Sequence, residues 1–200
     1  MITTWVAWCF LHSILISRSV TKYIQSHLPG LTNWYRIIYN CFSLLTLALP
    51  IYFMTSFVSP VVFRWVGIMQ LFRILLILMA IFLFREGAKK YDFGYFLGIQ
   101  QILTGKSSTL LGDEELFQPN GIFGIIRHPW YSGALLLIWS FWSEYTVTTI
   151  IVSTILSGYF VIGTVLEERK ILTEYGTQYS NYQQNVSMLF PWKWIRRHLK

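Results

Sequence analysis

Long stretches without charged residues are the feature that most constrains how this chain can fold. A helix needs roughly 20 apolar residues to cross the apolar core of a bilayer, which is about 30 Å thick. Three uncharged runs meet that length, and two shorter ones suit tilted helices or half of a tight hairpin. The five runs are 1–17, 37–63, 65–84 (interrupted by Arg73), 128–143 and 145–166. The sequence therefore predicts an all-α integral membrane bundle of about five transmembrane helices, the last two forming a hairpin.

The composition agrees with a membrane protein and excludes several other classes. Hydrophobic residues make up 54% of the chain and charged residues 12%, whereas ordinary globular chains carry about a quarter charged residues. This balance excludes a soluble enzyme, a disordered tail and a disulfide-stapled secreted module. The net charge of +7 comes from Lys and Arg that flank apolar runs, so we expect no nucleic-acid partner. Cys9 and Cys41 lie in apolar stretches without metal-ligand spacing, and we expect no metal site.

The distribution of Lys and Arg between the loops predicts the orientation. Most of these residues lie in 18–36, 85–127 and 167–200, and the opposite side holds only Arg64. Because cytoplasmic loops are enriched in basic residues, we expect the N-terminus outside and the C-terminus in the cytoplasm, in a bacterial inner membrane. We expect one domain, 1–200, with N-terminal spans (1–84), a cytoplasmic connector (85–127) and a C-terminal catalytic helical hairpin and tail (128–200).

The segment 121–133, GIFGIIRHPWYSG, has more polar and turn-forming residues than a simple loop requires. A basic residue on the cytoplasmic side and a proline in the first helical turn explain Arg127 and Pro129. They leave His128, Tyr131 and the glycines unexplained. A helix N-terminus carries partial positive charge and suits a carboxylate or phosphate, and Arg127 and His128 would add donors. The segment thus allows either an ordinary helix start or an anion pocket.

Two adjacent carboxylates, Glu167 and Glu168, follow the last apolar run. They could pair with Arg169 and Lys170, or the helix could continue and move its C-terminal dipole away. Carboxylates at a membrane boundary are costly, however, and are functional candidates for that reason. They would suit an ammonium group, ribose hydroxyls or a sulfonium centre.

Polar side chains inside the spans need partners. Arg73 lies near the middle of its run, so we expect it to face the bundle interior, with Gln70 or an acidic residue beside it. His12 suits an interhelical hydrogen bond or a substrate path. In the tail, the spacing of Tyr175, Tyr179 and Tyr182 predicts one aromatic helix face, either an interfacial helix or a wall over a site.

These motifs together resemble the isoprenylcysteine carboxyl methyltransferase-like superfamily of integral-membrane methyltransferases. The resemblance rests on Arg-His-Pro-x-Tyr-x-Gly at 127–133, Glu-Glu-Arg at 167–169 and Leu-Phe-Pro at 189–191. Leu-His-Ser at 11–13, Tyr-Arg at 35–36, Tyr-Asn at 39–40 and Asp-Phe-Gly at 92–94 look like the NnrU and methanethiol S-methyltransferase branch. No GxGxxG follows a strand, so a Rossmann-type methyltransferase is excluded.

The resemblance implies S-adenosyl-L-methionine as cofactor and assigns roles to residues. The implied cofactor-binding residues are Gly121, Phe123, Gly124, Arg127, His128, Pro129, Tyr131, Glu167 and Glu168. The implied catalytic residues are Arg127, His128 and Tyr131. Arg73, His12 and Tyr182 would line the substrate path.

The predicted activity is methyl transfer to a thiol or carboxylate of a small or lipophilic acceptor that enters from the bilayer, with membrane lipid as a partner. Such a transfer needs near-attack geometry and exclusion of water, and a cation such as Arg127 would favour a thiolate. Two alternatives remain open at this point. One is a phospholipid or amine N-methyltransferase of the same fold, and the other is a non-catalytic membrane protein.

Overall fold

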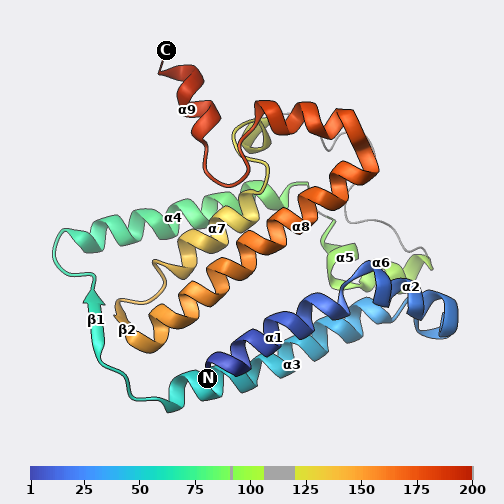
Figure 1. Ribbon diagram of the computed structural model, residues 1–200, viewed down its shortest axis with the longest axis horizontal. Helices are drawn as coiled ribbons and strands as arrows, with labels where there is room; N and C mark the ends of the chain where they lie inside the picture. Colours follow the sequence, from blue (N-terminus) through green and yellow to red (C-terminus); the bar gives the residue numbers. More distant parts are fainter. Residues whose placement is uncertain (91, 106–119, 200) are drawn as a thin grey trace. The chain divides into compact units, whose positions relative to one another are not determined.

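The structure is a computed structural model that describes residues 1–90, 92–105 and 120–199. The described residues are mostly helical, with a single two-stranded sheet among them (Figure 1). The chain forms two compact units, Met1–Pro60 with Tyr91–Leu111, and Val61–Lys90 with Gly112–Lys200.

Each of the five predicted runs overlaps a helix, and three of the helices extend beyond their runs. The helices are α1 (Ile2–Leu15), α3 (Tyr35–Ser56), α4 (Met69–Ala88), α7 (Pro129–Ile138) and α8 (Val147–Asn185). Two of them, α3 and α8, are long and apolar enough to cross a membrane, whereas α1 and α7 are shorter apolar helices. A largely helical chain with two candidate spans is thus established. The count of five spans stays a prediction.

In the first unit, α1 packs against α3, and α2 (Arg18–His27) and η1 (Pro29–Leu31) connect them. Trp5, Cys9 and Tyr39 are buried in this unit. The Tyr39 hydroxyl lies 2.9 Å from Nε2 of His12, so the interhelical hydrogen bond expected for His12 is present.

The same unit includes α5 (Phe93–Leu97) and α6 (Ile99–Thr104). The Asn40 amide donates to the carbonyls of Phe96 and Leu97 at 3.2 and 3.0 Å, and Nε of Arg36 donates to Phe96 O at 3.1 Å. Gly98 ends α5 with φ +96°, and a Cβ there would lie 2.7 Å from the backbone nitrogen of Ile37. Glycine is therefore required where α5 meets α3.

The second unit is built on α4, α7 and α8. Figure 1 shows α4 beside α7, which in turn packs on α8. A Cβ on Gly133 would lie 3.1 Å from the Ala80 carbonyl, so the absence of a side chain allows the close approach of the backbones. The Trp130 indole donates to Phe84 O at 3.0 Å. These contacts fix the beginning of α7 beside the end of α4.

A short antiparallel sheet departs from the all-α prediction. Strand β1 (Val61–Arg64) pairs with β2 (Glu144–Thr146), and Nε of Arg64 lies 3.3 Å from a Glu144 oxygen. The strands were not predicted because they lie at the ends of the apolar runs 37–63 and 145–166. Short β-branched and aromatic stretches of this kind fit either a strand or a buried helix. The pairing joins the segment before α4 to the segment between α7 and α8.

Hydrogen bonds hold the C-terminal tail against the end of α8 in this unit. α9 (Trp192–His198) follows α8, and Nζ of Lys193 donates to the carbonyls of Gln183 and Gln184 at 2.5 and 3.0 Å. Arg197 donates to Asn185 O at 2.8 Å. Basic side chains thereby satisfy carbonyls at the C-terminus of α8, where a helix leaves them without backbone partners.

Candidate functional site

The site forms because α8 turns back on itself at Gly176. This residue has φ +53° and ψ −125°, a non-helical conformation that glycine adopts without a Cβ penalty. In Figure 1 α8 changes direction near its end, and the last turns run back toward η3 (Gly121–Gly124). Residues after Gly176 can therefore contact residues before it.

The chain after α8 pairs with the segment that leads into α7. The backbone N–H of Arg127 donates to Ser187 O at 2.8 Å, and that of His128 donates to Met188 O at 3.1 Å. The Ser132 hydroxyl donates to Leu189 O at 2.7 Å. These bonds hold Arg127 and His128 at a fixed position in front of α7.

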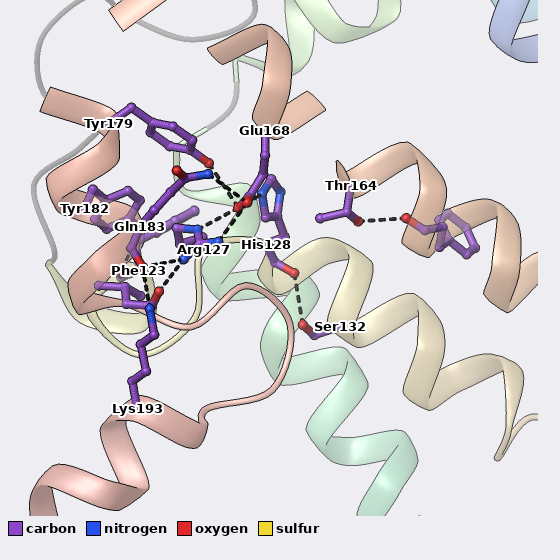
Figure 2. Close-up of polar contacts among 12 residues, drawn as sticks. Phe123, Arg127, His128, Ser132, Thr164, Glu168, Tyr179, Tyr182, Gln183 and Lys193 are labelled. Atoms are coloured by element: carbon purple, nitrogen blue, oxygen red, sulfur yellow. Dashed lines mark hydrogen bonds and ion pairs between the residues drawn. The ribbon is translucent and has the colours of Figure 1, made fainter. Parts of the chain in front are cut away.

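The Glu168 carboxylate is the centre of the site (Figure 2). Its Oε1 accepts from Nε of Arg127 at 2.6 Å, from Nε2 of His128 at 3.1 Å and from the Tyr179 hydroxyl at 3.2 Å. Its Oε2 accepts from Arg127 at 2.8 Å and from the Gln183 amide at 3.0 Å. Five donors occupy a group that offers about four lone-pair positions, so its accepting capacity is used within the protein.

The Arg127 guanidinium forms a two-point pair with Glu168 and is itself enclosed. Only 7% of its side chain and 10% of the Glu168 side chain are exposed. Its Nη1 donates to the carbonyls of Gln183, at 3.1 Å, and of Val186. A buried charge pair requires this degree of satisfaction, because desolvation otherwise outweighs the attraction between the charges.

The surroundings set the ionisation of the acidic groups. Burial by itself would raise the pKa of Glu168, but the hydrogen bonds from His128 and Arg127 and the Arg127 charge lower it from 4.5 to about 2. Burial, reinforced by the Glu168 charge, raises the pKa of Tyr179 well above 10. Glu168 is therefore an anion and Tyr179 a neutral donor at neutral pH.

His128 is the N-cap of α7, and Pro129 occupies the first helical turn, as the sequence predicts. The His128 ring lies 5.7 Å from the Tyr131 ring, which lies 5.8 Å from that of Phe160. One ring nitrogen contacts Glu168, and the other, Nδ1, makes no hydrogen bond to any residue that the structure describes. His128 thus contacts both the Glu168 carboxylate and the aromatic ring of Tyr131.

The predicted glycine segment, 121–124, is bonded to the last turns of α8 next to this cluster. The Tyr182 hydroxyl donates to Phe123 O at 2.6 Å, and Nζ of Lys90 lies 4.4 Å from the centre of the Phe123 ring. Gly121 has φ +57°, and among the described residues no atom beyond its chain neighbours lies within 4 Å of the position that a Cβ would take there. Tyr182 is buried and connects the last turns of α8 to η3, which contains Gly121, Phe123 and Gly124.

The two neighbouring glutamates differ in their surroundings. Glu168 is buried, whereas Glu167 is half-buried and its carboxylate has no hydrogen bond or ion pair to another residue in the described ranges 1–90, 92–105 and 120–199. Adjacent helical positions point about 100° apart, so one glutamate faces the cluster and the other does not. Glu167 keeps its full capacity to bind a cationic or hydroxyl group.

Arg73, one of the predicted residues, lies away from the cluster within the second unit. Arg73 donates to the carbonyls of Ser140 and Phe141 at 2.8 and 2.7 Å and to Gln70 at 3.3 Å, at the opposite end of α7 from His128. His12 lies in the unit that contains α1 and α3. The structure brings together Arg127, His128 and Glu168, and it does not join Arg73 to them.

Sequence reasoning missed the parts that Gln183 and Val186 play. Gln183 stands one helical turn after Tyr179, so the aromatic spacing noted in the tail could have led to it. The Val186 carbonyl has no side-chain signal and could not be found in this way.

Comparison with known proteins relates the chain to a class of methyl-transferring enzymes. It is 40% identical over 70 residues to a methanethiol S-methyltransferase of Pseudomonas deceptionensis, which is 35% of this chain and 26% of that protein. It is 31% identical over 101 residues to methanethiol S-methyltransferase 1 of Bradyrhizobium diazoefficiens, 48% of this chain and 33% of that one. A third, from Mycobacterium tuberculosis, is 31% identical over 98 residues, or 48% of this chain and 38% of the relative.

The matches cover between about a quarter and two fifths of the length of these relatives. No family model matches the chain, and no solved structure is significantly similar to it. The similarities confirm the resemblance to the methanethiol S-methyltransferase branch of the isoprenylcysteine carboxyl methyltransferase-like superfamily.

Proposed function

We infer that the protein is a membrane-bound methyltransferase that uses S-adenosylmethionine and acts on a small thiol. The observation that carries this proposal is the contact between the two motif segments at the start of α7, where Arg127 and His128 both bond to Glu168. The names of the similar proteins support a thiol as the acceptor. The apolar helices α3 and α8 support a membrane location, for which we propose the bacterial inner membrane with a cytoplasmic C-terminus.

The residues present fit S-adenosylmethionine by their chemistry. The amino-acid end of this cofactor carries an ammonium group, and its ribose carries hydroxyls. The unengaged Glu167 carboxylate would accept hydrogen bonds from either. The open space beside Gly121 leaves its backbone approachable, and the Tyr131 and Phe160 rings suit a sulfonium cation. When bound, the cofactor supplies a methyl group to the acceptor and keeps the electrons of the broken bond.

Within this proposal Arg127 and Glu168 maintain the geometry of the site and do not bind the cofactor themselves. Glu168 accepts five hydrogen bonds from the protein, and an additional ligand would have to displace one of them. Arg127 fixes the start of α7 to the tail through Gln183 and Val186. Together they orient His128 and exclude water from one side of the site.

Calorimetry with S-adenosylhomocysteine and detergent-purified protein tests the proposal. We expect micromolar binding that Glu167→Gln weakens at least tenfold, because the substitution removes the charge and keeps the size. Glu174→Gln, on an exposed position of the same helix, is the matched control and should bind normally. Absence of binding to a folded sample would refute the cofactor assignment.

A panel of acceptors then tests the substrate class. Small alkyl thiols, a carboxylate and a primary amine are incubated with radiolabelled S-adenosylmethionine, and the methylated product is measured. The proposal expects the thiols to be methylated well above the others. Preferential methylation of the amine would favour an N-methyltransferase instead.

A further inference from the structure

We propose that Nδ1 of His128 removes the proton from the thiol, and that Glu168 is the positioning residue that leaves this nitrogen available. The inference rests on the proposed function and adds to it the group that activates the acceptor. Thiols react as thiolates, and an ordinary alkyl thiol near neutral pH is mostly protonated. A site for such an acceptor therefore gains from a base.

The contact between His128 and Glu168 determines which ring nitrogen carries the proton. A carboxylate can only accept hydrogen bonds, so Nε2, at 3.1 Å from Oε1, must be an N–H. In a neutral imidazole the other nitrogen is then a lone-pair acceptor. Nδ1 has no hydrogen bond to a residue in the described part of the chain, so no protein group there uses that lone pair.

The other polar groups of the cluster cannot take this part. Glu168 is held as an anion of low basicity and has its acceptor positions filled. Tyr179 remains protonated and donates its hydrogen to Glu168. Arg127 has no acceptor atoms, and Glu168 neutralises its charge at 2.6 and 2.8 Å. His128 is the basic group that remains.

In the described part of the chain, four charged or titratable groups lie at the His128 ring or at its Glu168 partner. They are Arg127 in the preceding segment, Tyr131 of α7, and Glu168 and Tyr179 of α8. The Arg127–Glu168 pair sums to zero charge. The Nε2–H of His128 therefore lies against a carboxylate whose charge Arg127 already balances.

The proposed step transfers one proton. The S–H bond of the acceptor breaks, the proton binds Nδ1, and the electron pair stays on sulfur, which becomes the nucleophile. His128 then carries a proton on both nitrogens, with Nε2–H still donating to Glu168. The imidazolium afterwards releases the Nδ1 proton to water and returns to its starting tautomer.

Nitrogen NMR tests the tautomer without any turnover. The chain has four histidines, and comparison with His128→Gln identifies the His128 signals in protein carrying ¹⁵N-labelled histidine. Above the pKa of the ring, we expect an unprotonated Nδ1 and a protonated Nε2. Glu168→Gln should give a mixture of tautomers, because a glutamine amide can donate as well as accept. A protonated Nδ1 in the unaltered protein would overturn the inference, even where methylation occurs.

Kinetics with thiols of different acidity test the proton transfer. His128→Gln retains an N–H near the Nε2 position, which can still donate to Glu168, but it lacks a basic nitrogen. General base catalysis contributes about 10²–10⁴-fold, so we expect a loss of that size with a weakly acidic alkyl thiol. With an aromatic thiol that is already ionised, the loss should stay below about threefold. His198→Gln, on an exposed position of α9, is the matched control.

The outcomes separate the two proposals. Equal losses with both thiols, or no loss with either, would overturn the role of His128 while leaving the methyltransferase assignment intact. Both thiols are measured at saturating S-adenosylmethionine, so that a change in cofactor affinity affects the two rates alike and the ratio of the two losses tests the base. If the unaltered protein binds no S-adenosylhomocysteine, the proposed function fails and the role of His128 fails with it.

Discussion

Replacing Glu168 by glutamine should destabilise the fold strongly, although the two side chains have nearly the same size. The substitution removes the negative charge and leaves the Arg127 guanidinium enclosed without its counter-ion. It also places an NH₂ group where two acceptor oxygens now receive five donors. An uncompensated buried charge is among the most costly defects that a folded protein can contain.

The size of the effect follows from the ionisation of Glu168. Lowering its pKa from 4.5 to about 2 corresponds to about 3 kcal/mol of interaction that favours the charged form. This agrees with the roughly 3–5 kcal/mol observed when one partner of a buried pair is removed. We therefore expect Glu168→Gln to lower the free energy of unfolding by about 3 kcal/mol.

Equilibrium unfolding in detergent, followed by helical circular dichroism, measures this change. Glu174→Gln makes the same substitution at an exposed site on α8 and should alter the free energy of unfolding by less than about 1 kcal/mol, the range of surface ion pairs. The double variant Arg127→Met with Glu168→Gln should lose less than the sum of the two single changes, because neither charge remains buried alone. A loss below about 1 kcal/mol for Glu168→Gln, or strict additivity in the double variant, would refute the reasoning.

Three further perturbations act on the same unit. Because the folded state lowers the pKa of Glu168, its stabilisation is complete above pH 4.5 and declines toward pH 2; unfolding free energies of the unaltered protein should fall over this range more steeply than those of Glu168→Gln. Gly176→Ala forces a side chain into φ +53° and should lower the free energy of unfolding by about 1–3 kcal/mol in denaturant. Gly158→Ala, at an open helical position, is the control and should be neutral or stabilising by up to about 1 kcal/mol. Equal effects of the two substitutions would contradict the reversal at Gly176. Gly87→Ala places a methyl group against the Trp130 indole and should cost about 1–3 kcal/mol by the same assay, and an unchanged stability would show that the two helices separate easily.

The sequence predicted much of the helical framework because uncharged runs and proline placement are strong local signals. Pro129 begins α7 as expected, and Gln70 does contact Arg73. The two strands escaped detection because Val61 and its neighbours are apolar, and an apolar stretch of that length has no period that separates a strand from a helix.

The reversal of α8 could not be predicted from its glycines. Gly158 and Gly163 lie in the same helix with ordinary helical backbone, and Gly176 alone among these three adopts a positive φ. The neighbouring residues do not distinguish them, because a tyrosine adjoins both Gly158 and Gly176 and a threonine follows both Gly163 and Gly176. The difference between Glu167 and Glu168 was hidden for the same reason, because the direction of the helix relative to Arg127 decides which carboxylate is enclosed.

The contacts of Arg127 also impose an order on biosynthesis. The carbonyls of Gln183 and Val186 that accept its hydrogen bonds are synthesised 56 and 59 residues after it. At roughly 5–20 residues per second, the ribosome takes roughly 3–12 s to reach them. During that interval Arg127 and His128 are part of the nascent chain without the segment that holds them. The cluster therefore closes only after the tail has been translated, and a chain interrupted before residue 183 carries both motif segments but cannot enclose Arg127.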